Sequence, residues 1–263
     1  MLDMLHPRSD LRLITMEGMA GVCDYGDGAE RYISADMTEF YGGTDYTNAK
    51  SIVLTQIRYS YAAPEKPWTL ARLCGGGKSR KTSIIGKIAA DWRSIASGQD
   101  MTNERSRLVI MSNQPLAADD AQALSSLRQH AASLSSGKCD PHYTPGLDDD
   151  ALAALKALED ATGLHDPKET AGFLLALSLD GFGQPDLLQS VAEASLLVQE
   201  WYSGLSAAGV NHLMAAAQEA ATAGFAQSIT PDYVRGLLGI SDSDLNPAPY
   251  ICTPTPNWLL PSL

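Results

Sequence analysis

The sequence predicts a mixed α/β fold in its first half and an α-helical region in its second half. Residues 51–59 and 107–111 are rich in β-branched and other apolar side chains, which predicts two strands. Between them, residues 83–95 carry isoleucines and a tryptophan at helical spacing, which predicts an amphipathic helix. A strand, a helix and a second strand in this order are typical of an α/β core.

The elements before the first of these strands are shorter. Residues 29–34 are expected to end a helix, and residues 36–41 to be extended. The pair Gly42-Gly43 predicts the turn that closes this extended segment. After the strand, Pro64 and Pro67 interrupt any regular element.

The second half is expected to be almost wholly helical. Apolar periodicity predicts helices over residues 118–134, 148–162, 185–205 and 210–223. Thr230-Pro231-Asp232 predicts the start of a last short helix that ends at Gly239.

The chain has 263 residues, enough for one large domain or two small ones. We place the boundary loosely between Gly137 and Gly146. The α/β core then covers residues 1–140, and the helical region covers residues 141–263, with an extended proline-rich tail from Asn246.

The charge is distributed unevenly between the two halves. The formal net charge is −12. Residues 1–113 hold 14 Lys and Arg against 13 Asp and Glu, whereas residues 114–263 hold 5 against 18. The acidic load therefore lies in the second half, where it favours solubility. A nucleic-acid ligand is compatible with the nearly neutral first half only.

Cysteine usage and hydropathy indicate the compartment. The four cysteines are far apart in the sequence and form no CxxC pair, which favours reduced thiols. No apolar run reaches the roughly 18 residues that a membrane-spanning helix needs. The first ten residues carry charges of both signs and no apolar core of a signal peptide. We expect a cytoplasmic protein that does not enter a membrane.

A polar pair interrupts the first predicted strand. Gln56 and Arg58 are two residues apart, so they point to the same face of the sheet. Asp36 begins the preceding extended segment, twenty residues upstream. Polar side chains on a buried strand are costly unless they are paired or functional. One interpretation is a structural ion pair with Asp36 near a sheet edge. The other is an active site.

Several motifs follow one another along the chain in a distinctive order and spacing. They are Asp36-Met37-Thr38-Glu39-Phe40-Tyr41-Gly42, Gln56-Ile57-Arg58-Tyr59-Ser60, Trp68-Thr69-Leu70-Ala71-Arg72-Leu73, Ser83-Ile84-Ile85-Gly86-Lys87 and Ile110-Met111-Ser112-Asn113. In this order and spacing the chain resembles the PD-(D/E)XK-type, nuclease-like effector domains of bacterial anti-phage defence proteins, which are often fused to a large NTPase. The similarity covers about residues 14–113 well and the helical half only loosely.

This resemblance implies a restriction-endonuclease-like mixed sheet and a metal-dependent nuclease acting on DNA. Asp36 and Gln56 would hold Mg²⁺, or Mn²⁺, and Arg58 would be the third catalytic residue. Arg58 stands where the family has lysine. Arginine stays protonated, so it can contact a phosphate but is a poor base. Glu30 or Glu39 would be the source of a second carboxylate, but Glu39 lies on the opposite strand face from Asp36.

Two functions follow and stay open. The first is a defence effector that binds DNA and cleaves its phosphodiester bonds. The second is a catalytically degenerate module of the same fold, used for homo-oligomerisation or nucleic-acid sensing beside an NTPase domain or partner. The acidic, Ala- and Leu-rich helices fit self-association or docking on such a partner.

A basic loop follows Gly75-Gly76-Gly77. Lys78, Arg80 and Lys81 are candidate contacts to a nucleic-acid backbone; the alternative is a solvated loop. The loop lacks the first glycine of a phosphate-binding P-loop, because that position is Arg72. Trp68 and Trp92 are expected to anchor the core rather than to stack on bases.

Overall fold

A computed structural model of the chain describes most of the α/β core and several helices of the second half. The described residues are Met4, His6, 9–16, 35–60, 62–75, 83–96, 105–135, 146–183, 207–222 and 227–240.

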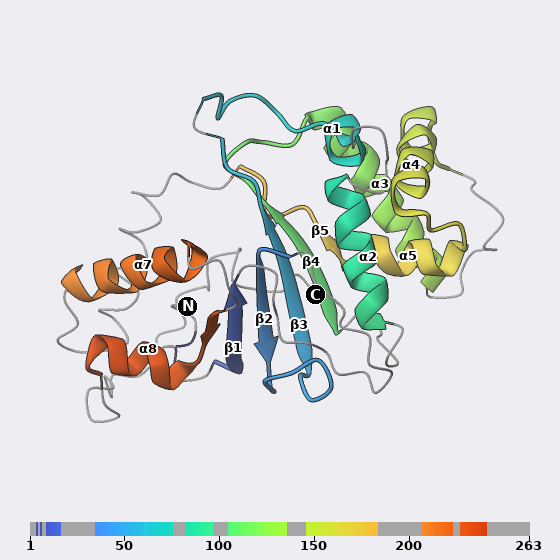
Figure 1. The fold of residues 1–263 in the computed structure, drawn as a ribbon. Coiled ribbons are helices and arrows are strands. Elements are labelled where there is room, and N and C mark those ends of the chain that lie inside the picture. Colours follow the sequence, from blue (N-terminus) through green and yellow to red (C-terminus); the bar gives the residue numbers. More distant parts are fainter. Residues whose placement is uncertain are drawn as a thin grey trace, which may run out of the picture.

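A six-stranded mixed sheet forms the centre of the molecule (Figure 1). Its spatial order is β5-β4-β3-β2-β1-β6. Strands β1, β2 and β3 form an antiparallel meander, and β6 pairs antiparallel with β1. Strand β4 pairs parallel with β3, and β5 pairs parallel with β4. The strands are β1 (Leu11–Met16), β2 (Met37–Tyr41), β3 (Ser51–Ile57), β4 (Ser106–Met111), β5 (Leu177–Ser178) and β6 (Gln227–Ile229).

Helices lie in two groups, on either side of the described sheet in Figure 1. Helices α1 to α5 gather near β3, β4 and β5, whereas α7 and α8 lie beside β1. The helices are α1 (Leu70–Cys74), α2 (Ile84–Ala96), α3 (Ala118–Ser135), α4 (Asp149–Thr162), α5 (Pro167–Ala176), α7 (Ala207–Thr222) and α8 (Pro231–Leu238).

The strongest sequence signals are confirmed. Strands β3 and β4 and helices α2, α3, α4 and α7 lie where the periodicity predicts them, within a few residues at each end. Asp148 caps α4 by accepting a hydrogen bond from the backbone N–H of Ala151, and Thr230 caps α8 in the same way. The helix ends predicted at residues 29–34, the helix at 185–205 and the tail from Asn246 lie outside the described residues.

The prediction of an almost wholly helical second half is wrong in two places. The short strands β5 and β6 both come from that half and extend the two edges of the sheet. The proposed boundary falls largely on residues outside the described part of the chain. The specific restriction-endonuclease-like fold stays a prediction, and the coarser mixed α/β class is confirmed.

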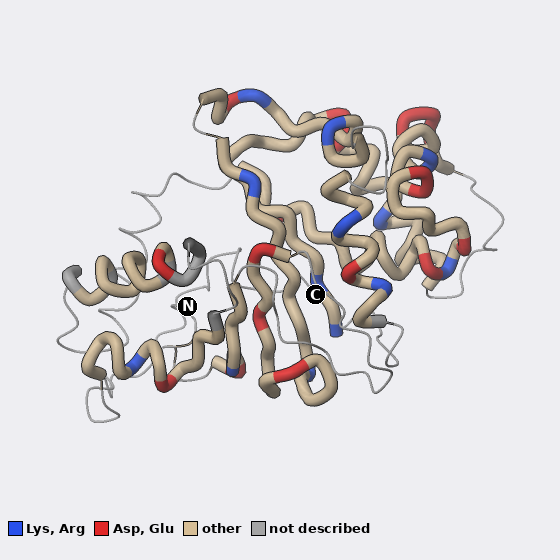
Figure 2. The backbone as a smooth tube through the Cα atoms, in the orientation of Figure 1, with Lys and Arg blue, Asp and Glu red and all other residues tan. Residues whose placement is uncertain are grey.

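Two apolar clusters lie between the sheet and the helices that pack on it. The larger cluster contains the inward residues of β2, β3 and β4 together with residues of α1 to α5, so it joins both halves of the sequence. The smaller one packs β1 and β6 against α7 and α8. Figure 2 shows acidic positions on α3, α4 and α5, which fits the charge imbalance of the sequence.

The structure bears on the expectations about membrane-spanning helices and about the cysteines. Among the described residues, no helix is both long enough and apolar enough to cross a bilayer. Cys74, at the end of α1, is buried and makes no disulfide bond. The other three cysteines lie outside the described part of the chain.

Candidate functional site

The pairing of β2 with β3 brings the three sequence-predicted site residues together. Met37 pairs with Thr55, so the residue before Met37 lies across from Gln56. The Gln56 Nε2 donates a hydrogen bond to the Asp36 Oδ2. Arg58 follows β3, and its backbone N–H donates to the Met111 carbonyl oxygen at 2.8 Å, which continues the pairing with β4. Asp36, Gln56 and Arg58 therefore meet at one end of the sheet.

A single carboxylate oxygen is the centre of this site. The Asp36 Oδ2 accepts hydrogen bonds from the Gln56 side chain, from the backbone N–H of Ile57 at 2.6 Å and from the Arg58 Nη1 at 3.2 Å. The same Nη1 donates to the Ile57 carbonyl oxygen at 2.6 Å. The guanidinium is thus held in one orientation by two acceptors. The ion pair that the sequence allowed between Asp36 and Arg58 is confirmed.

The three side chains differ in their access to solvent. Gln56 is buried, with 2% of the residue exposed. The Asp36 and Arg58 side chains are 38% and 33% exposed. An ion pair this open to water contributes little to stability, typically about 0–1 kcal/mol. The Arg58 guanidinium therefore stays accessible to a ligand.

Gln56 also carries an unsatisfied group. Its Oε1 is buried and has no hydrogen-bond partner among the described residues. A buried acceptor without a partner costs about 1–3 kcal/mol. Such a buried group suits an ordered water that can donate to it.

The described residues around Asp36 offer few ligands for the expected Mg²⁺. The set is one carboxylate and one amide, and the carboxylate oxygen already accepts three hydrogen bonds. A guanidinium nitrogen 3.2 Å from that oxygen repels a divalent cation. In the described part of the chain, no three His, Cys, Asp or Glu side chains gather closely enough to hold a metal ion. As arranged, these residues do not fit Mg²⁺, and the metal stays a prediction.

Glu39 and Glu30 are the other carboxylates that the sequence offers for this site. Glu39 lies on the other face of β2, where it pairs across the strands with Ile14 and Val53. It accepts a hydrogen bond from the Tyr41 hydroxyl at 3.4 Å and does not join the site. Glu30 lies outside the described residues, as do the basic candidates Lys78, Arg80 and Lys81.

Three consecutive residues after β4 hold the chain that follows Arg58. We call Ser112, Asn113 and Gln114 the polar clamp. The Asn113 side chain accepts from the Ser60 N–H at 3.0 Å and donates to the Ser60 carbonyl oxygen at 2.9 Å. The Gln114 Nε2 donates to the Ala63 carbonyl oxygen at 2.7 Å.

Ser112 completes the clamp by accepting from Trp68. The Trp68 Nε1 donates to the Ser112 Oγ at 3.0 Å. The three clamp residues thus bind three different residues, Ser60, Ala63 and Trp68. The resemblance had singled out Ser112 and Asn113 without a role, and nothing in the sequence indicated Gln114. Such pairings, some fifty residues apart, cannot be found from local patterns.

Both tryptophans are core anchors, as predicted. Trp68 is 9% and Trp92 is 5% exposed, and each ring nitrogen donates to a buried serine hydroxyl. Arg72 lies over the Trp68 ring, with its guanidinium carbon 4.0 Å from the ring centroid. The Trp68 ring therefore supports a cation rather than a stacked base.

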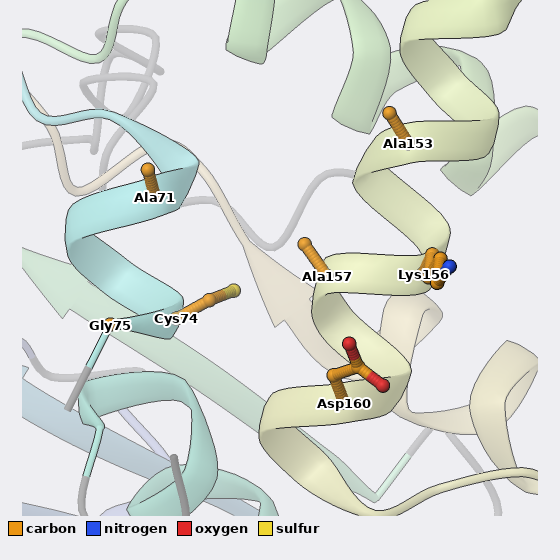
Figure 3. Close-up of a pocket in the computed structure, with 7 residues that line it drawn as sticks. All are labelled: Ala71, Cys74, Gly75, Ala153, Lys156, Ala157 and Asp160. Carbon is orange, nitrogen blue, oxygen red and sulfur yellow. The ribbon is translucent and has the colours of Figure 1, made fainter. Parts of the chain in front are cut away.

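A cavity of about 410 Å³ lies between α1 and α4. Figure 3 shows Cys74 pointing from α1 toward α4, with Asp160 and Lys156 on α4 at its lining. Neither Asp36, Gln56 nor Arg58 lines it. The cavity is therefore separate from the candidate site.

Comparisons with known proteins add no further identification. No family model matches the chain, and the search of curated proteins finds no match.

Proposed function

We propose that this chain is a nucleic-acid-binding module of nuclease-like fold, in which Arg58 contacts a backbone phosphate. One observation carries the proposal. Asp36, Gln56 and Arg58 converge at the end of two neighbouring strands, and the Arg58 guanidinium there is oriented and one-third exposed. The resemblance of residues 14–113 to nuclease-like effector domains supports DNA as the nucleic acid.

The chemistry of Arg58 suits binding better than proton transfer. A guanidinium offers several donors in a plane, which matches two oxygens of a phosphate, and it keeps its charge. Asp36 and the Ile57 carbonyl oxygen use one of its nitrogens, Nη1. A phosphate can approach the remaining donors without first breaking these contacts.

The net charge of the whole chain affects the expected affinity for DNA and its dependence on salt. With a net charge of −12, the protein repels a polyanion at long range. Binding therefore depends on local cations, and we expect modest affinity that falls further as salt is added. Figure 2 shows basic positions on the chain between β3 and α1, at the end of the sheet that holds Arg58.

The first prediction concerns Arg58→Gln. Loss of one charge-assisted contact of about 1.5 kcal/mol is expected to weaken binding of a fluorescent duplex oligonucleotide about tenfold. Fluorescence anisotropy at low salt measures the affinity. Arg235→Gln on α8 is the matched control, because its partner is the largely exposed Asp232 on the same helix. Unchanged affinity in Arg58→Gln, or an equal loss in both variants, contradicts the proposal.

Metal-dependent cleavage, which the resemblance of residues 14–113 implies, is the second candidate. The unpartnered Gln56 Oε1 beside the Asp36 carboxylate favours it, but Arg58 would first have to leave the Asp36 oxygen that it contacts at 3.2 Å. Plasmid and linear DNA incubated with Mg²⁺ or Mn²⁺ test it, with Asp36→Ala as control. Cutting that needs the metal and is lost in the control supports an active nuclease. In that case Arg58→Lys is expected to raise the rate.

The setting of the module follows from the same resemblance. We propose that it belongs to an anti-phage defence protein, that it forms homo-oligomers and that it acts beside an NTPase domain or partner. Light scattering of the purified chain tests the oligomer directly. A monomer at all concentrations removes self-association from the proposal and leaves binding by Arg58 untouched.

A further inference from the structure

We propose that Arg72 is a second, preorganised phosphate contact, placed on the same support as Arg58. This inference rests on the proposed function and names a further binding residue for it. The ligand is the sugar-phosphate backbone of a nucleic acid.

Two uncharged groups hold Arg72. Its guanidinium lies on the face of Trp68, with the guanidinium carbon 4.0 Å from the ring centroid. Its Nη1 donates to the Pro67 carbonyl oxygen at 3.0 Å. A stacked guanidinium keeps its plane fixed while its other donors point away from the ring. Neither partner neutralises the charge, so the cation remains available to an anion.

The support beneath Arg72 is itself fixed. The Trp68 ring donates to Ser112, a member of the polar clamp. The Trp68 N–H donates to the Pro115 carbonyl oxygen at 2.7 Å, and its own carbonyl oxygen accepts from Ala117 at 2.8 Å. Trp68 is therefore anchored through both its backbone and its side chain. A cation held on such an anchor loses little conformational entropy when it binds.

The same clamp connects Arg72 with Arg58. Asn113 holds Ser60, two residues after Arg58, and the adjacent Ser112 holds the ring under Arg72. Two adjacent residues after β4 therefore hold the chain near Arg58 and the ring beneath Arg72. Figure 1 shows the segment between β3 and α1 projecting beyond this end of the sheet. The three side chains of the polar clamp all hold this one segment. Such support is expected where a binding surface must keep a fixed shape.

Lys66, the third basic residue near this end of the sheet, is a weaker candidate for a phosphate contact. Lys66 is exposed but directly follows the exposed Glu65, which offsets its charge. Asp120, on α3, accepts from the Leu70 N–H at 3.0 Å through one carboxylate oxygen. Arg72, rather than a general basic patch, is therefore the second contact.

The test compares Arg72→Gln with the unchanged chain in DNA binding across a series of salt concentrations. Loss of one phosphate contact is expected to weaken binding about threefold to tenfold and to reduce the salt slope by about one. Arg72→Lys keeps the charge but loses the fixed plane, so an intermediate affinity is expected. Lys156→Gln on α4 is the control for removing an exposed positive charge, and it is expected to bind like the unchanged chain.

Each outcome decides something. Equal affinity and equal salt slope for Arg72→Gln and the unchanged chain overturn the role of Arg72. If Arg58→Gln still weakens binding in that experiment, the proposed function stands without it. If the unchanged chain binds neither duplex nor single-stranded DNA, both the proposed function and the role of Arg72 are overturned. A thermal melt of each variant shows whether a lost fold explains lost binding.

Discussion

Phe173→Ala is expected to destabilise the chain by about 3–5 kcal/mol, the range for removing a buried aromatic side chain. Phe173 lies on α5 and is 1% exposed. Its ring meets the Trp92 ring of α2 edge to face, with centroids 5.9 Å apart. Trp92 in turn donates to Ser106 at the start of β4. The substitution therefore removes a contact between the helical second half and the centre of the sheet.

The size of this effect tests whether the two halves share one core. Domains are typically stable by about 5–15 kcal/mol, so the loss is a large fraction of the total. Urea denaturation followed by tryptophan fluorescence and by circular dichroism measures it. Leu152→Ala on α4 is the control, because Leu152 is 40% exposed, and a change within about 0.5 kcal/mol is expected. A comparable loss in both variants, or separate transitions for the two probes, contradicts a shared core.

Gly181→Ala is expected to destabilise the chain by about 1–3 kcal/mol, the usual cost of forcing extra atoms into a packed interior. A Cβ at Gly181 would lie 2.3 Å from the carbonyl oxygen of Ile110 in β4, a group that cannot move aside as a side chain can. The Gly181 carbonyl oxygen also accepts from the Ser112 N–H at 2.8 Å. The substitution therefore strains the backbone that contacts Ser112 of the polar clamp.

A second glycine provides the comparison. Gly236 lies in α8, and a Cβ there has no atom within 4 Å among the described residues. Gly236→Ala is expected to stabilise the chain by about 0.4–1 kcal/mol, because alanine restricts the unfolded chain and favours helix. Differential scanning calorimetry measures both variants. Opposite signs support the close approach at Gly181, and a neutral Gly181→Ala contradicts it.

The sequence predicted the elements that carry strong local signals. Helix α4 begins after Asp148, whose side chain caps it, and ends before Gly163, which adopts φ 70°. Four of the seven residues of strand β3 are β-branched. Strands β5 and β6 have two and three residues, too few to show any periodicity, and form only because a sheet edge lies beside them.

The candidate site was predictable in part. The spacing of Asp36, Gln56 and Arg58 placed them on neighbouring strands, and the pairing of β2 with β3 brings them together. The polar clamp was not predictable, because Asn113 and Ser60 are 53 residues apart and meet only after β3 and β4 pair. The support of Arg72 by Trp68 depends on the same tertiary contacts.

Asp36→Asn tests the central claim most directly, through the affinity for duplex DNA measured without metal. Asparagine keeps an oxygen that can accept from Ile57 but removes a negative charge beside Arg58 that repels an approaching phosphate. Removing this repulsion, which is of the size of an exposed ion pair, about 0.2–1 kcal/mol, is expected to tighten binding up to about fivefold. Tighter binding by Asp36→Asn, absent when Arg58 is also glutamine, agrees with Arg58 as the phosphate contact. Unchanged or weaker binding by a folded Asp36→Asn contradicts it.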